Sequence, residues 1–267
     1  MSTDSSAGVR HASHPRMKFI LVALLSSSLR IGRYSRAPTS RAELSGMPAT
    51  EIEKAGAAPP RYNEGDMDLK TAPPHPSELP ILRFPGEIRV VDRPEGVEPM
   101  ARDLAREPLL GFDTETRPTF LKGQKHLPAL VQLATADRAY IIQLRRAGFT
   151  AALIALLSDP KVLKIGVGVR DDLTALQQLS PFMPQGFVDL GDLAKSKGIA
   201  QRGARSLTAR FLQGRLSKSV QTSNWAVKDL SERQKTYAAT DAWVCLRIYP
   251  LLLAEPSAAE SQAGGRE

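Results

Sequence analysis

Apolar and polar residues follow two different patterns along the chain, and the change falls near residue 81. Residues 1–80 carry many prolines, serines, alanines and charged side chains, and their apolar residues show no helical or strand period. Such a segment buries too little apolar surface to offset the entropy lost on ordering. From residue 81 to residue 254, short apolar runs alternate regularly with segments whose apolar residues have helical spacing. The pattern therefore predicts a folded domain at 81–254 between disordered tails at 1–80 and 255–267.

One apolar run, from Phe19 to Leu25, interrupts the N-terminal tail. The run is too short to span a bilayer, so no membrane partner is expected. Lys18 ahead of it gives a faint resemblance to a secretory signal, while the Arg- and Ser-rich composition before Arg41 resembles an organelle transit peptide. The alternative is a later translation start, at Met17 or Met47, with the upstream residues not native.

Six strands and six helices are expected within the folded part. Apolar runs predict strands at 87–92, 109–114, 129–134, 139–143, 162–167 and 187–189, and helical spacing predicts helices at 98–107, 149–158, 171–179, 190–197, 207–212 and 232–253. Ser231 and Gln234 have the spacing of a capping box at the start of the last helix. The order of elements predicts an α/β fold with a mixed sheet, three antiparallel strands then parallel strands, flanked by helices.

Acidic residues stand at the end of one buried strand. Asp113 and Glu115 are two apart, so on a strand their side chains share a face. The apolar run Leu109–Phe112 before them places both acids at the carboxyl edge of the sheet, where ligands bind in open α/β folds. The alternative is an ordinary solvated strand end.

Two further acidic positions follow in helices. Asp171 and Asp172 come after a glycine-containing strand, and spacing alone does not say which of them faces a site; either can also oppose the helix dipole. Tyr237 and Asp241 are four apart, hence on one helix face, and the alternative there is a purely structural Tyr–Asp hydrogen bond. Carboxylates that converge from separate elements repel one another unless a hard cation such as Mg²⁺ or Mn²⁺ lies between them.

The net charge and the basic residues of the chain indicate a polyanionic partner. The 267 residues carry a formal net charge of +8, and a basic balance favours polyanionic partners. No acid lies between Asp192 and Asp229, and the candidate phosphate contacts in this stretch are Arg202, Arg205, Arg210, Arg215 and Lys218. About half of these basic residues are expected to be ordinary solvated positions. Trp225 either stacks on a base or packs the last helix.

Cysteine content bears on the compartment. Cys245 is the single cysteine of the chain, so no internal disulfide forms. This fits a reducing compartment, and we expect a cytoplasmic location. The sequence indicates no obligate protein partner.

Three ordered motifs resemble those of the DEDD superfamily of 3′–5′ exonucleases, in its tyrosine-bearing (DEDDy) branch, and within it the RNase D / Werner-syndrome exonuclease-domain family. These motifs are GFDTET with the following ALVQLAT, then KIGVGVRDDLTAL, then SNWAVKDLSERQKTYAATDAWVCLRIY. The resemblance selects Asp172 over Asp171. The sister branch has a histidine where this chain has Tyr237, and no histidine stands four or five residues before Asp241.

The resemblance implies an RNase H-like fold and a two-metal hydrolysis of DNA or RNA from a free 3′ end. By this resemblance Asp113, Glu115 and Asp241 hold one Mg²⁺ or Mn²⁺ ion, Asp113 bridges to a second ion with Asp172 helping through water, and Tyr237 orients the attacking water. The product is a nucleoside 5′-monophosphate. The alternatives are a catalytically silent nucleic-acid-binding module of the same fold and a related endonuclease or transposase-type nuclease.

Overall fold

The computed structural model describes residues 78–119 and 126–256. Most of the two predicted tails lies outside these residues, and only 78–80 and 255–256 are described. The interpretations of the apolar run and of the start codon also concern residues outside the described part. Among the described helices, none is both long enough and apolar enough to cross a membrane. Contacts already begin just ahead of the predicted domain start, because Arg215 Nε donates to the Leu79 carbonyl at 2.8 Å.

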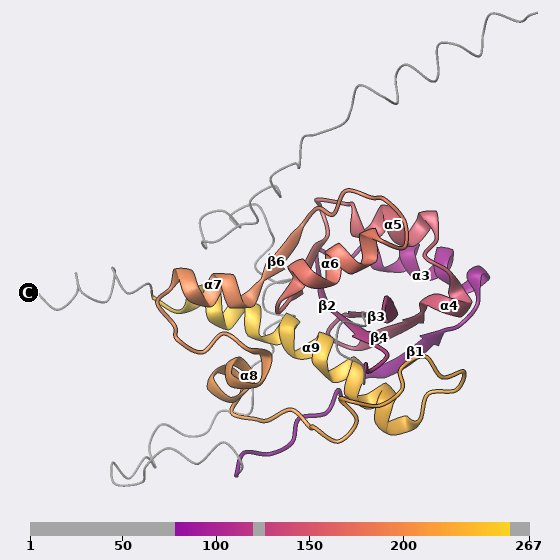
Figure 1. Ribbon diagram of the computed structural model, residues 1–267. Coiled ribbons are helices and arrows are strands. Elements are labelled where there is room, and N and C mark those ends of the chain that lie inside the picture. Colours follow the sequence, from indigo (N-terminus) through magenta and orange to yellow (C-terminus); the bar gives the residue numbers. More distant parts are fainter. Residues whose placement is uncertain (1–77, 120–125, 257–267) are drawn as a thin grey trace, which may run out of the picture. The chain divides into compact units, whose positions relative to one another are not determined.

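A six-stranded mixed sheet forms the centre of the fold (Figure 1). Its strands are β1 (Glu87–Val91), β2 (Leu109–Thr116), β3 (Pro128–Ala134), β4 (Arg138–Gln143), β5 (Leu163–Gly166) and β6 (Phe187–Asp189), in the order β1-β4-β3-β2-β5-β6. β2, β3 and β4 run antiparallel to their neighbours in that group, while β5 and β6 continue parallel to β2. The predicted mixed sheet is therefore confirmed. β1 adds a parallel edge next to β4.

Helices cover both faces of this sheet. They are the short 3-10 helix Pro94–Gly96, α3 (Val97–Leu104), α4 (Leu144–Ala147), α5 (Ala151–Leu157), α6 (Val169–Gln177), α7 (Leu190–Ser196), α8 (Ala204–Leu212) and α9 (Glu232–Ala254). Leu110 and Phe112 of β2 face the apolar core shared with α3, α5 and α6, whereas Leu109 packs with α7 and α9 on the other face. Alternate residues of one strand thus contribute to two separate cores.

Element boundaries differ from the prediction where local geometry is special. α6 begins at Val169 rather than 171, because Gly168 takes the left-handed conformation at φ 73° and serves as its N-cap. β2 continues to Thr116 rather than ending at 114, so Glu115 lies within the strand. The capping box at the start of α9 is confirmed, with Gln234 N donating to Ser231 Oγ at 3.3 Å and Ser231 N to Gln234 Oε1 at 3.0 Å.

α9 lies against β2, and at Gly111 the backbone of the helix comes close to that of the strand. A Cβ added to Gly111 would stand 2.0 Å from the carbonyl oxygen of Ala242. The neighbouring α9 residues Ala238 and Ala239 are fully buried as well. Small side chains on both elements therefore allow the helix backbone to lie against the strand, and Figure 1 shows α9 crossing the sheet.

Replacing Gly111 by alanine is expected to push α9 off β2, because the new methyl group has no room. Overpacking of this kind costs about 1–3 kcal/mol, and thermal unfolding should record a fall in Tm of roughly 2–4 °C for each kcal/mol. Gly203→Ala is the matched control, since its Cβ would meet only Ser206 Oγ at 3.8 Å and its φ is −84°. Equal Tm values for Gly111→Ala and wild type would contradict the close approach.

Candidate active site

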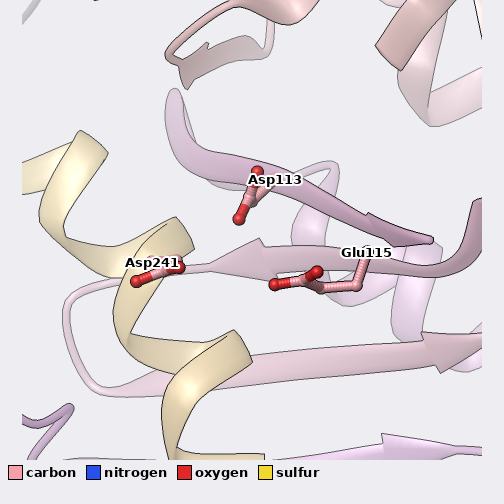
Figure 2. A group of neighbouring side chains, drawn as sticks. All are labelled: Asp113, Glu115 and Asp241. Atoms are coloured by element: carbon pink, nitrogen blue, oxygen red, sulfur yellow. The ribbon is translucent and has the colours of Figure 1, made fainter. Parts of the chain in front are cut away.

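Three carboxylates from two elements meet beside the Gly111 contact. Asp113 and Glu115 follow Gly111 on the same face of β2, and Asp241 precedes Ala242 on α9. One carboxylate oxygen from each residue lies within 4.8 Å of the others. Figure 2 shows the side chains of Asp113 and Glu115 reaching from the strand toward Asp241 on the helix. The packing of α9 on β2 therefore builds the cluster.

Burial and mutual repulsion disfavour the charged forms of these acids. Loss of solvation raises the pKa of Asp113 well above its usual value, and the charges of Asp241, Glu115 and Asp172 raise it further. Burial, with the charges of Asp241 and Asp172, raises the pKa of Glu115 to about 8. Burial also raises the pKa of Asp241 to about 7, although the Tyr237 hydroxyl and the Arg205 charge act in the opposite direction. Without a cation, the cluster therefore holds protons at neutral pH.

This donor set fits a hard divalent cation. The cluster offers carboxylate oxygens only, which suit Mg²⁺ and Mn²⁺ better than softer ions. A cation between the three acids would attract carboxylates that otherwise repel one another. Its charge would therefore favour their ionised forms and oppose the rise in their pKa values. The side chains that would hold it are Asp113, Glu115 and Asp241.

Asp172 lies beside this cluster rather than within it. It belongs to the first turn of α6, and its Oδ1 accepts a hydrogen bond from Thr114 Oγ1 at 2.5 Å. Burial raises the pKa of Asp172 to about 6, against the lowering effect of that hydrogen bond. Asp171 is solvent-exposed, so the structure turns Asp172 toward β2 and leaves its neighbour outside. The charge of Asp172 nevertheless acts on both Asp113 and Glu115.

Tyr237 and Trp225 pack against each other next to the acids. Their ring centroids are 5.7 Å apart with the planes tilted by 41°. Burial, followed by the charges of Asp241 and Glu115, raises the pKa of Tyr237, so its hydroxyl keeps its proton and acts as a donor. Trp225 is 0% exposed. In this structure Trp225 therefore takes the packing role, and its ring is not placed to stack on a base.

The predicted basic residues divide into two groups. Arg202 and Lys218 are exposed, and Arg205 is close enough to Asp241 to lower its pKa. By contrast, Arg210 is paired with Glu255, and Arg215 holds the backbone of Leu79. Arg205 also donates to Gln221 Oε1 at 2.6 Å, so three of the five predicted phosphate contacts have structural partners.

A groove beside the acids brings in two arginines that the sequence did not single out. Its volume is about 510 Å³, and it is lined by Ile81, Leu82, Arg83, Ser217, Ser219, Glu232, Arg233, Thr236, Tyr237, Thr240 and Asp241. Arg233 stands four residues before Tyr237, so helical spacing was a signal for it. Arg83 had no signal, because it reaches the groove only through pairing of its segment with residue 215 and a bond from Phe84 N to Thr240 Oγ1 at 2.9 Å.

Comparisons with known proteins show the family to which this chain belongs. Residues 88–255 match the family model described as 3′–5′ exonuclease. The mouse bifunctional 3′–5′ exonuclease/ATP-dependent helicase WRN is 30% identical over 184 residues, which are 65% of this chain and 13% of that protein. Ribonuclease D of Gluconacetobacter diazotrophicus is 31% identical over 174 residues, which are 64% of this chain and 43% of that protein. This chain therefore spans less than half the length of both relatives.

Structural similarity leads to the same class. The crystal structure of the Aedes aegypti Nibbler EXO domain has a TM-score of 0.57 and 26% identity, with coverage of 67% of this chain and 94% of that one. The fold is thus RNase H-like, as the motifs implied. The chain belongs to the 3′–5′ exonuclease family, of the type that includes ribonuclease D and the exonuclease domain of WRN.

The raised pKa values give a pH prediction for the metal-free protein. Unfolded carboxyl groups titrate near pH 4, so between that pH and about 8 the folded state binds more protons than the unfolded state. The free energy of unfolding should therefore fall as pH rises through this window. Thermal unfolding in chelator should show a lower Tm at the upper end, and Mg²⁺ should raise Tm more there, because it binds the ionised carboxylates.

Asp113→Asn is the companion variant for that measurement. With one acid neutralised, the fall of Tm with pH should become shallower and the Mg²⁺ effect should shrink. A metal-free Tm that rises from pH 5 to about 8 would show that the buried acids do not dominate the titration of the fold.

Proposed function

We propose that this protein is a metal-dependent 3′–5′ exonuclease that hydrolyses phosphodiester bonds of DNA or RNA and releases nucleoside 5′-monophosphates. The observation that carries the proposal is the cluster of Asp113, Glu115 and Asp241, with Tyr237 on the same face of α9 as Asp241. Family membership supports the reaction class and the direction of degradation. Mg²⁺ or Mn²⁺, as a pair of ions, is the proposed cofactor.

The side chains divide the chemistry among them. Two bound divalent cations supply Lewis acidity and lower the pKa of water. Asp113, Glu115 and Asp241 hold and orient the cation site, and Asp172 adds negative charge from the α6 side. Tyr237, kept protonated by burial and by the surrounding acids, donates its hydroxyl hydrogen to orient the attacking water. Trp225 fixes the Tyr237 ring from behind.

The substrate strand is proposed to lie in the groove beside α9. The groove is lined by Tyr237 and Asp241 and also by the two arginines Arg83 and Arg233. Exposed Ile81, at 42% exposure, offers an apolar surface to a base. Two guanidinium groups, hydroxyls and an apolar side chain next to the acids match the phosphates, sugars and bases of a strand.

A catalytically silent binding module is the alternative of another class. Against this alternative, Asp113 and Glu115 lie beside Asp241 with raised pKa values, and a module that only binds has no need to keep such acids together. The cytoplasmic location that the single cysteine indicates stays a prediction. The choice between DNA and RNA is left to the assay below, since both carry the same phosphates.

Catalysis is tested by degradation of matched 5′-labelled DNA and RNA strands with Mg²⁺, Mn²⁺ or chelator. Wild type should shorten the strands stepwise from the 3′ end only with metal. Asp113→Asn should lose at least about 10³-fold in rate because a cation ligand is gone, and Tyr237→Phe on the order of 10²-fold because one oriented donor is lost. Asp172→Asn should slow the reaction, whereas the matched control Asp171→Asn, at an exposed position, should not. Binding of the strand without shortening would instead support the silent module.

The groove is tested with the double variant Arg83→Ala/Arg233→Ala. KM for a single strand should rise while kcat holds, because the arginines grip the strand away from the reacting bond. The slope of log affinity against log salt should shrink by about 0.7 for each lost phosphate contact. Arg106→Ala, an exposed residue after α3 on the opposite face of the sheet, is the control. An unchanged salt slope in the double variant would place the strand elsewhere.

A further inference from the structure

Gln132 of β3 lies directly across from Asp113. The two residues are register partners in the antiparallel pair of β2 and β3, so their side chains share the face that α9 covers. Paired residues of this kind have Cβ atoms about 4.5–5.5 Å apart. On its other side, Gln132 is paired with Ile141 of β4. The amide thus stands between a site carboxylate and an apolar residue.

The side chain of Gln132 is buried without a hydrogen-bond partner. Its exposure is 0%, and neither Nε2 nor Oε1 is bonded to any of the residues that the structure describes. Leu130 and Ile141, its neighbours on the same face, belong to the apolar cluster with Tyr237 and Ala238. An unpaired amide in such surroundings costs about 1–3 kcal/mol. Folding alone would be served better by an apolar side chain at this position.

The other buried glutamine of the sheet shows what a structural amide does. Gln143 donates through Nε2 to the carbonyls of Val227 and Lys228, at 3.3 and 3.1 Å, and so holds the loop before α9. Gln132 makes no such backbone contact among the described residues. Its amide is therefore placed to serve the neighbouring Asp113 carboxylate rather than the backbone.

We propose that Gln132 is a positioning residue, whose Nε2 donates to the Asp113 carboxylate and fixes its orientation toward the bound cation. This inference rests on the proposed function, because it requires that Asp113 be a cation ligand. A carboxylate that ligates a cation has lone pairs left over, and donors behind the ligand orient it and are needed for full metal affinity. A neutral amide suits this place, since it stays a donor at every pH and adds no charge to a crowded cluster.

Gln132→Met tests the inference, because methionine has a similar length and no amide. The metal-free variant should unfold at the same Tm as wild type or higher, since a buried unpaired group is removed. Mn²⁺ affinity, measured by titration calorimetry, should fall about 10–100-fold. kcat should fall with it at limiting Mn²⁺, recover at saturating Mn²⁺, and leave KM for the nucleic acid unchanged. Gln132→Leu repeats the test with a different shape if the methionine variant fails to fold.

Two controls separate positioning from packing. Leu133→Met changes the adjacent residue on the opposite face of β3 and should leave Mn²⁺ affinity unchanged. Gln143→Met should lower Tm without changing Mn²⁺ affinity, since it loses bonds to the loop. Wild-type Mn²⁺ affinity in both Gln132 variants would overturn the inference while leaving the proposed function intact. Failure of wild type itself to bind Mn²⁺ would count against the proposed function instead.

Discussion

The contact between α9 and β2 at Gly111 is the constraint on which the site depends. The carbonyl of Ala242 occupies the space that a side chain at position 111 would fill. This approach brings Asp241, one residue earlier on the helix, to a position where its carboxylate lies within 4.8 Å of those of Asp113 and Glu115. The alanines on the inner face of α9 serve the same purpose. The stability of the fold and the geometry of the acidic cluster therefore depend on one interface, where a single additional methyl group would separate the acids.

The same interface concentrates unfavourable charge. Burial under α9 raises the pKa of Asp113, Glu115 and Asp241, and each ionised acid disfavours the others. Such a cluster destabilises the metal-free folded state, and a divalent cation that binds between the acids would stabilise it. The unpaired amide of Gln132 fits the same logic, because under our proposal its partner is the Asp113 carboxylate held toward the cation.

Local spacing was enough to predict much of the fold and which acids meet in one cluster. The two-residue spacing of Asp113 and Glu115 on a strand placed both on one face, and the four-residue spacing of Tyr237 and Asp241 did the same on a helix. Features that depend on distant pairings were out of reach. The parallel pairing of β1, the Thr114–Asp172 hydrogen bond, the approach of Arg83 and the burial of Trp225 all follow from how separate segments meet.

Asp113, Glu115 and Asp241 are proposed to form a cation site between β2 and α9. Anomalous diffraction from crystals grown with Mn²⁺ would locate the ion relative to these three side chains. Manganese is expected to bind oxygens of all three side chains, at about 2.0–2.3 Å as hard-cation distances require, and to be absent from this place in Asp113→Asn. Crystals of wild type with no manganese signal between these residues, or with manganese held only elsewhere, would contradict it.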